Sequence, residues 1–462
     1  MKNMQKERVP MREAAPDVRN KNFEEVALGY TPEEAMLEAS RCLSCKNHPC
    51  MDGCPVSVRI PEFLELAAAG KFAEAYAVIK STNALPAVCG RVCPQENQCE
   101  GKCVRGLKGE PVAIGRLERF CADWAREHTG TPQTAILPEN APRVAVVGSG
   151  PAGLSCAGML AQNGCRVTVF EALHAPGGVL VYGIPEFRLP KSIVSAEVDV
   201  LRAAGVEFAC DTVIGRSYTI DELQAEGYDA VFIGSGAGLP QFMGIEGEGL
   251  CGVYSANEYL TRVNLMKAYR EDAMTPVLHA KHVAVIGGGN VAMDAARCAK
   301  RMGAEEVYII YRRGEEEMPA RREEVHHAKE EGIIFKLLTN PTAIHGDENA
   351  CVKSISVVEM ALGEPDASGR RRPQPVEGSD YEIAVEAVIE AVGTRPNPLL
   401  RMTTPGLESN RHGCLVVSED GVSTTKDGVY AGGDAVTGAA TVILAMGAGK
   451  AAAAKILERL GK

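Results

Sequence analysis

The sequence predicts an α plus α/β fold, in which an N-terminal all-α domain precedes two Rossmann-like dinucleotide-binding domains, the second inserted in the first. Two observations carry this prediction. Eight of the sixteen cysteines lie between Cys42 and Cys103, and two glycine-rich fingerprints follow them, each directly after a β-branched strand. The expected boundaries are residues 1–140 for the helical domain and its linker, 141–250 and 393–462 for the first Rossmann-like domain, and 251–392 for the insert.

Composition and charge argue against several classes of function. The net charge is -11 and no basic stripe occurs, which argues against a nucleic-acid partner. No apolar run reaches the roughly 18 residues that a membrane-spanning helix needs. The basic start is not followed by an apolar stretch, so we expect no signal peptide. Sixteen cysteines without an export signal favour reduced thiols or metal ligands in a cytoplasmic protein.

The first 125 residues have helical patterns and no strand pattern. Residues 1–30 are polar and are expected to form an extended arm. A helix should begin at Pro32, because Thr31 suits the N-cap and Glu34 completes a capping box. Further helices are expected at residues 60–67, 72–79 and 114–128, the first two forming a hairpin broken at Gly70, with a linker at 130–142.

The cysteines of this region fall in two runs with short spacings. The first run is Cys42, Cys45, Cys50 and Cys54, and the second is Cys89, Cys93, Cys99 and Cys103. A 4Fe-4S cluster takes four ligands, mostly thiolates, and short spacings let one loop bind several irons. Eight thiols suffice for two such clusters. Zinc sites with four thiolates use similar spacings, but zinc would offer no path for electrons.

The first fingerprint follows a predicted strand at residues 143–147. Its glycines allow a tight turn, a close approach of the backbone to a pyrophosphate, and close packing of helix on strand. Glu171 ends the next strand and suits the ribose hydroxyls of FAD. Near the C-terminus a helix is expected to begin at Thr441 and to direct its positive end at the flavin. The candidate FAD contacts are Gly148, Gly150, Pro151, Ala152, Gly153, Glu171, Gly178, Gly433, Asp434 and Thr441.

The second fingerprint follows a predicted strand at residues 283–286. Its candidate contacts with a nicotinamide dinucleotide are Gly287, Gly289, Asn290, Val291 and Ala292. The next strand ends in Arg312 and Arg313, where an NAD-specific fold would place an acid. Two guanidinium groups suit a 2′-phosphate and therefore predict NADP(H). The alternative is that these arginines pair with the acidic residues 315–317.

Four longer stretches are more specific than either glycine loop, and they lie at residues 89–94, 183–191, 311–324 and 431–434. With the overall layout, they make the chain resemble the small (β) subunit of bacterial NADPH-dependent glutamate synthase. Its relatives include the N-terminal half of dihydropyrimidine dehydrogenase and the large subunit of NADH-dependent reduced ferredoxin:NADP+ oxidoreductase. The resemblance covers essentially the whole chain. It implies NADP(H), FAD and two 4Fe-4S clusters, with hydride transfer between stacked rings rather than through an acid–base side chain.

The resemblance also implies that the two cysteine runs share their ligands. One cluster would be held by Cys42, Cys45, Cys50 and Cys103, and the other by Cys54, Cys93, Cys99 and Glu118. Counting thiols alone instead assigns Cys89 to the second cluster and leaves Glu118 as a solvated glutamate. Arg188, within residues 183–191, is the further candidate contact with FAD. The eight cysteines after residue 103 are expected to be small core residues.

These features predict an enzyme subunit that delivers electrons to another chain. No CxxC or CxxxxC pair follows residue 103, which argues against a thioredoxin- or lipoamide-reductase type. A start at Met1-Lys2-Asn3 offers no N-terminal nucleophilic cysteine for an amidotransferase, and no FMN barrel is recognisable. The expected partner is an electron-accepting subunit, either a glutamate synthase large subunit or a small flavin and 2Fe-2S subunit, and ferredoxin is a further candidate. The sequence does not choose between them.

Overall fold

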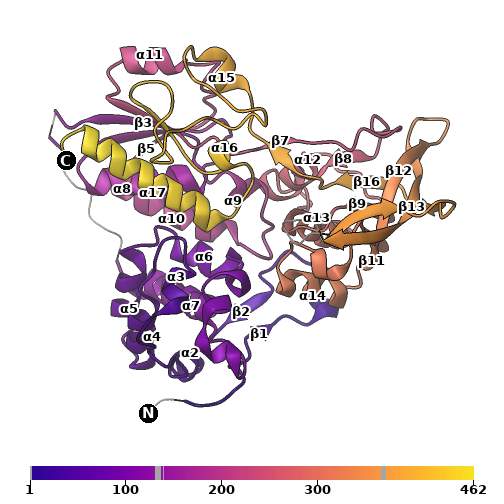
Figure 1. Ribbon diagram of the computed structural model, residues 1–462, viewed down its shortest axis with the longest axis horizontal. Coiled ribbons are helices and arrows are strands. Elements are labelled where there is room, and N and C mark those ends of the chain that lie inside the picture. Colours follow the sequence, from indigo (N-terminus) through magenta and orange to yellow (C-terminus); the bar gives the residue numbers. More distant parts are fainter. Residues whose placement is uncertain (1–2, 131–136, 139, 366–370) are drawn as a thin grey trace.

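The computed structural model describes residues 3–130, 137–138, 140–365 and 371–462, so much of the expected linker at 130–142 lies outside the described residues. Figure 1 shows a helical N-terminal region at the bottom and two units with parallel sheets, one above it and one to the right. The predicted α plus α/β fold is therefore confirmed.

The helices predicted for the N-terminal region begin and end close to the expected positions, and α3 and α6 are found in addition. Helix α2 (Pro32–Ala39) has the expected capping box, since the Glu34 backbone N–H donates to the Thr31 hydroxyl and the Thr31 N–H donates to the Glu34 carboxylate. Gly70, with φ +73°, separates the two helices of the hairpin. The other helices are α3 (Pro49–Asp52), α4 (Ile60–Ala68), α5 (Phe72–Lys80), α6 (Pro86–Val92) and α7 (Ile114–His128).

The expectation of an all-α region with an extended arm is incomplete. Strand β1 (Arg12–Glu13) pairs antiparallel with β2 (Ala27–Gly29), and a single helical turn, α1 (Pro16–Arg19), lies between them. Strands of two and three residues are too short to show an alternating pattern, so the sequence gives no signal for them.

The first unit has a five-stranded parallel sheet in the order β18-β6-β3-β4-β5. Its last strand and last helix come from the C-terminal end of the chain, as the split domain predicted by the sequence requires. The strands are β3 (Arg143–Val147), β4 (Arg166–Phe170), β5 (Glu207–Ala209), β6 (Ala230–Ile233) and β18 (Val429–Ala431). The helices are α8 (Pro151–Gln162), α9 (Val179–Tyr182), α10 (Lys191–Ala203), α11 (Ile220–Ala225), α15 (Leu399–Thr403), α16 (Asp434–Thr437) and α17 (Val442–Arg459).

The second unit has a five-stranded parallel sheet in the order β11-β10-β9-β16-β8. Its strands are β8 (Val253–Ser255), β9 (His282–Ile286), β10 (Glu306–Tyr311), β11 (Ile334–Leu337) and β16 (Ala387–Glu390). Its main helices are α12 (Ala256–Leu260), α13 (Asn290–Arg301) and α14 (Arg322–Glu330). An antiparallel sheet of β12 (Thr339–Gly346), β13 (Val352–Pro365), β14 (Arg371–Pro375) and β15 (Tyr381–Ala384) projects from it (Figure 1).

The chain passes from the first unit to the second and back through two short strands. Strand β7 (Leu239–Pro240) leaves the first unit and pairs antiparallel with β17 (Thr394–Arg395), which returns to it. Both crossings therefore lie side by side, as they do when one domain is inserted in another.

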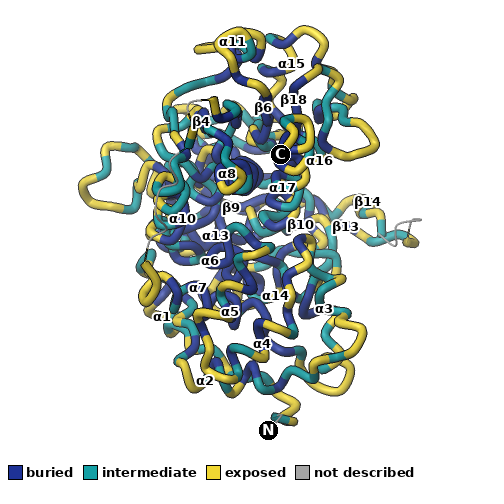
Figure 2. The backbone as a smooth tube through the Cα atoms, turned by 90° about the vertical axis from the view of Figure 1, so that its left-hand side faces the viewer, coloured by how far each residue is buried: buried dark blue, intermediate teal, exposed yellow. Residues whose placement is uncertain are grey.

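The helical region and the first unit share one apolar core. Phe63 of α4 and Leu117 of α7 belong to the same buried cluster as Ile193 of α10 and Met446 of α17. Buried stretches run through α6, α7 and α8 in the middle of the molecule (Figure 2). The N-terminal region is therefore packed onto the first unit through a shared apolar core.

A buried charge cluster joins the N-terminal arm to the second unit. The Glu331 carboxylate, 1% exposed, lies 3.0 Å from Nε of Arg19, 2.7 Å from Nη2 of Arg297 and 2.7 Å from Nη1 of Arg301. Burial alone would raise the pKa of Glu331, but Arg297 and Arg301 outweigh it and lower that pKa. The carboxylate therefore stays ionised and compensates the buried guanidinium groups.

Replacing Glu331 by Gln should lower the free energy of unfolding by about 3–5 kcal/mol, because three buried guanidinium groups lose their shared counter-charge. Urea denaturation at neutral pH measures this. Since the folded-state pKa is depressed, the contribution is present above the unfolded pKa of about 4.3 and declines as the pH falls below it. Glu315→Gln, which breaks a half-exposed pair with Lys329, is the control and should change the stability by at most about 0.5 kcal/mol. Equal effects of the two variants would contradict a structural role for the cluster.

Candidate functional site

Four cysteines of the N-terminal region surround one small pocket. They are Cys42, Cys45, Cys50 and Cys103, and apolar side chains such as Ile60 and Leu64 complete the lining. Burial, with Cys42 and Cys103 nearby, raises the pKa of the Cys50 thiol to about 12. A metal that replaces the thiol protons relieves this cost. The donor set fits the first predicted 4Fe-4S cluster, and the ligand assignment stays a prediction.

A second group of cysteines gathers around Glu118 of α7. The carboxylate of Glu118 is buried and accepts a hydrogen bond of 2.7 Å from Nδ2 of Asn83. Burial raises the pKa of Glu118 to about 7. Burial raises the pKa of the Cys99 thiol. Nearby groups, which include Glu100, Glu118 and Cys54, raise it further. Glu118 is therefore not the solvated glutamate that counting thiols alone implies, because its side chain on α7 is buried.

Cys89 lies beside the same group, so the structure does not choose between Cys89 and Glu118. Cys89 is fully buried in α6, and the thiols of Cys89 and Cys93 are hydrogen-bonded to each other. The Cys89 thiol also donates to the sulfur of Met446 over 3.5 Å. Met446 belongs to α17, so this contact joins the cysteine group to the first Rossmann unit.

The first fingerprint has the backbone that a dinucleotide requires. Gly148 has φ +98°, and a Cβ there would lie 2.6 Å from the Gly234 carbonyl oxygen. A Cβ at Gly153 would lie 1.9 Å from the Gly148 carbonyl oxygen, so α8 packs on β3 only with glycine at this position. The space beside Gly150 is open to 4 Å, which leaves the start of α8 accessible to a pyrophosphate. Pro151 and Ala152 begin the helix.

Glu171 is tied to the fingerprint through Ser149, a residue that sequence reasoning missed. Its Oε2 accepts from the Ser149 hydroxyl and, over 3.0 Å, from the Ser149 N–H, while its Oε1 accepts from the Leu173 N–H over 2.9 Å. A carboxylate has about four acceptor positions, so one remains for a ribose hydroxyl. The Ser149 hydroxyl also accepts from the Gly177 N–H over 2.9 Å, which holds the loop before Gly178 against the fingerprint.

The C-terminal candidates close the same unit. Gly433, with φ +66°, precedes α16, and a Cβ there would lie 3.1 Å from Cβ of Ala152. Burial raises the pKa of Asp434 to about 6. Thr441 is the N-cap of α17, as predicted, and its hydroxyl accepts from the Leu444 N–H over 3.4 Å. These residues lie at the end of α17 that also contacts the cysteine group.

The second fingerprint repeats this geometry between β9 and α13. Gly287 has φ +142°, and a Cβ there would lie 2.6 Å from the Ala391 carbonyl oxygen. Gly289 is the N-cap of α13, and the side chain of Asn290 accepts from the Arg321 N–H over 2.9 Å. Ala292 is fully buried against the sheet, whereas Val291 is exposed.

Arg312 and Arg313 follow β10 at the same edge of the sheet. The acidic residues nearby have other partners, since Glu315 pairs with Lys329 while Glu316 and Glu317 pair with Arg371. Arg313 donates from Nε to the Arg371 carbonyl oxygen over 3.2 Å, and Arg312 is exposed. The alternative that these two arginines serve to pair with residues 315–317 therefore has no support among the described contacts.

Arg188 joins the two Rossmann units. Its Nη1 lies 2.7 Å from Asp294 of α13 and its Nε lies 2.9 Å from Glu324 of α14. Burial alone would lower the pKa of Arg188, but Asp294 and Glu324 outweigh it and raise that pKa. These contacts give Arg188 a structural role that the sequence did not predict. Its contact with FAD stays a prediction.

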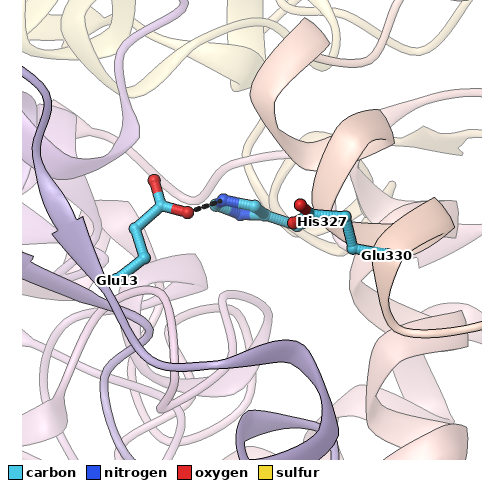
Figure 3. Close-up of side chains that lie close together, drawn as sticks. All are labelled: Glu13, His327 and Glu330. Atoms are coloured by element: carbon cyan, nitrogen blue, oxygen red, sulfur yellow. Dashed lines mark hydrogen bonds and ion pairs between the residues drawn. The ribbon is translucent and has the colours of Figure 1, made fainter.

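Glu13, His327 and Glu330 form a further cluster, between the N-terminal arm and α14 (Figure 3). Nε2 of His327 lies 3.0 Å from the Glu13 carboxylate. The guanidinium of Arg19 lies 3.6 Å from the Glu13 carboxylate and 2.6 Å from that of Glu330. Because the Arg19 guanidinium contacts both carboxylates, the cluster is part of the ion-pair network around Arg19.

The comparisons with known proteins agree with this arrangement. Residues 19–130 match the family model described as dihydropyrimidine dehydrogenase domain II, 4Fe-4S cluster. Residues 142–449 match the model described as pyridine nucleotide-disulphide oxidoreductase. No helix within the described ranges is long and apolar enough to cross a membrane.

Two similar relatives are glutamate synthase (NADPH) small chains. The one from Halomonas elongata is 40% identical over 447 residues, which cover 96% of this chain and 94% of that protein. The one from Escherichia coli is 37% identical over 449 residues, covering 96% and 95%. Among solved structures, FprA of Mycobacterium tuberculosis in complex with NADPH has a similar fold, with a TM-score of 0.59 at 21% identity over 70% of this chain and 85% of that chain. The chain therefore belongs to the glutamate synthase small-chain family of iron–sulfur flavoprotein oxidoreductases.

Proposed function

We propose that this chain moves electrons between NADP(H) and a partner subunit by way of FAD and two 4Fe-4S clusters. The observation that carries the proposal is the position of α17. The N-terminal part of α17 belongs to the first Rossmann unit. Met446 in the same part of the helix contacts Cys89, which lies beside the second cysteine group. The nucleotide unit and the second cysteine group are therefore joined through one helix.

The cofactor positions follow from the site geometry. When bound, FAD would accept hydride from the nicotinamide and the clusters would carry single electrons. The backbone at Gly148, Gly150 and Gly153, with Glu171, is suited to hold the FAD. The backbone at Gly287 and Gly289 and the guanidinium groups of Arg312 and Arg313 are suited to hold NADP(H). The proposed cluster ligands are Cys42, Cys45, Cys50 and Cys103 for one cluster and Cys54, Cys93, Cys99 and Glu118 for the other.

The partner we propose is a glutamate synthase large subunit, because both small-chain relatives align over nearly their whole length. The alternative is a small flavin and 2Fe-2S subunit, which uses the same cofactors on this chain. We infer a cytoplasmic location from the cysteine usage. Purification of the native protein with identification of the copurifying chain by mass distinguishes the two partners, since the first is a very long chain and the second a short one.

The protein purified without oxygen should contain about eight irons and eight acid-labile sulfides per FAD, as two 4Fe-4S clusters require. Metal analysis with flavin quantification measures this ratio. Stoichiometric zinc with negligible iron and sulfide would mean that the cysteine groups are structural zinc sites, and the proposed electron path would be wrong.

The fourth ligand of the second cluster can be tested with two variants. If Glu118 is the ligand, Cys89→Ser should keep the full iron content and the magnetic spectrum of the reduced protein. Glu118→Ala should then lose or alter one cluster, because alanine offers no ligand atom to the fourth iron. FAD content reports that each variant has folded. Loss of half the iron in Cys89→Ser, with none lost in Glu118→Ala, would show that Cys89 is the ligand.

Removing both Arg312 and Arg313 by alanine substitution should weaken NADPH binding by about 2–4 kcal/mol, since two charge-assisted contacts with the 2′-phosphate disappear. Titration of the oxidised protein with NADP+ and NAD+ measures the two dissociation constants. The affinity for NAD+ is the internal control and should barely change. An equal loss of both affinities would show that the arginines only support the fold.

A further inference from the structure

Two cysteines of the second unit lie next to each other at its surface, although the sequence predicts that both are core residues. Cys251 precedes β8 and is exposed, and Cys351 precedes β13 and is partly exposed. The two residues are partners in an isolated parallel β-bridge. The Cys251 N–H donates to the Ala350 carbonyl oxygen over 2.9 Å, and the Val352 N–H donates to the Cys251 carbonyl oxygen over 2.9 Å.

This bridge places the two cysteines at a backbone separation that allows a disulfide bond. Bridged backbones lie about 4.7–4.9 Å apart, within the Cα separation of about 4.4–6.8 Å that a disulfide needs. A hydrogen bond to Cys251 raises the pKa of the Cys351 thiol, and Asp347 adds to this effect. The two cysteines are therefore neighbours across the bridge, and the more exposed Cys251 is the one that a dissolved oxidant reaches first.

The turn before Cys351 is held firmly. The carboxylate of Asp347 accepts from the N–H groups of Asn349 and Cys351, each over 2.9 Å. Ala350, with φ +57°, completes the turn between β12 and β13. The backbone that presents Cys351 to Cys251 is thus fixed by its own hydrogen bonds and does not depend on a bond between the sulfurs.

We propose that Cys251 and Cys351 are a redox-sensitive thiol pair that closes to an intramolecular disulfide in the presence of a low-molecular-weight disulfide such as oxidised glutathione. The Cys251 thiolate attacks one sulfur of the oxidant, and one glutathione thiolate leaves. The Cys351 thiolate then attacks the Cys251 sulfur of the mixed disulfide, and a second glutathione leaves. The two cysteines are oxidised, the oxidant is reduced to two thiols, and these take up the two protons.

The disulfide would enclose the central part of the second unit. The closed loop between residues 251 and 351 contains β9, the second fingerprint, and Arg312 and Arg313. A crosslink that closes a long loop removes conformations mainly from the unfolded chain. Oxidation should therefore stabilise the nucleotide-binding unit without moving its backbone, because the two residues are already paired.

The test uses the full protein with its cofactors, incubated with oxidised glutathione without oxygen and then alkylated. Trypsin should release residues 217–262 and 337–353 as peptides that each contain one cysteine, Cys251 and Cys351. The expected result is a crosslink between these two peptides in mass spectrometry without reductant, lost on reduction. The oxidised protein should also unfold at a temperature several degrees above that of the reduced protein.

Three variants decide the outcome. Cys251→Ser and Cys351→Ser should each lose the crosslink and the shift in unfolding temperature, while Cys210→Ser, which removes a half-buried cysteine of the first unit, should keep both. Iron and FAD contents, measured before and after oxidation, should not change. Separate alkylation of both cysteines, or a stable glutathione adduct on Cys251 without a crosslink, would overturn the proposal.

Discussion

The apolar contact between the N-terminal helices and the first Rossmann unit is the constraint on which the rest of the structure depends. Electrons move between cofactors only when the cofactors are held close together, and here a single hydrophobic core joins the elements that hold them. Helix α17 is the central element of this contact. A Cβ at Gly449 would lie 2.1 Å from the Ala152 carbonyl oxygen, so α17 lies directly on α8, while Met446, about one turn earlier in α17, contacts Cys89. Burial of apolar surface therefore fixes the distance between fingerprint and cysteines.

Charged contacts add to apolar ones at the second unit, where Val26 and Phe187 belong to its buried cluster. The arm is held to α13 and α14 through Arg19 and Glu331, and the loop at 183–191 is held through Arg188. Cζ of Arg301 lies 3.8 Å from the centre of the Phe187 ring, in a cation–π contact. Interfaces between domains of one chain are commonly more polar than a domain core.

Much of this arrangement could be predicted from the sequence because its signals are local. The capping box at Thr31, the glycine turns and the N-cap at Thr441 each depend on residues a few positions apart. What the sequence could not show depends on contacts between distant segments. The sequence around Glu118 does not indicate that Asn83 donates a hydrogen bond to it. The sequence around Arg188 does not indicate that it pairs with Asp294. The pair of Cys251 and Cys351 is equally nonlocal, since the two cysteines lie 100 positions apart in the sequence and both have apolar neighbours.

The central claim is that one continuous path leads from the nucleotide units to the cysteine groups. It is tested most directly by adding NADPH without oxygen to the isolated chain and recording flavin absorbance and the low-temperature magnetic spectrum in one experiment. The account predicts that the flavin bleaches and that a signal of a reduced 4Fe-4S cluster follows with no partner present. Bleaching with no cluster signal under any reductant would contradict the account.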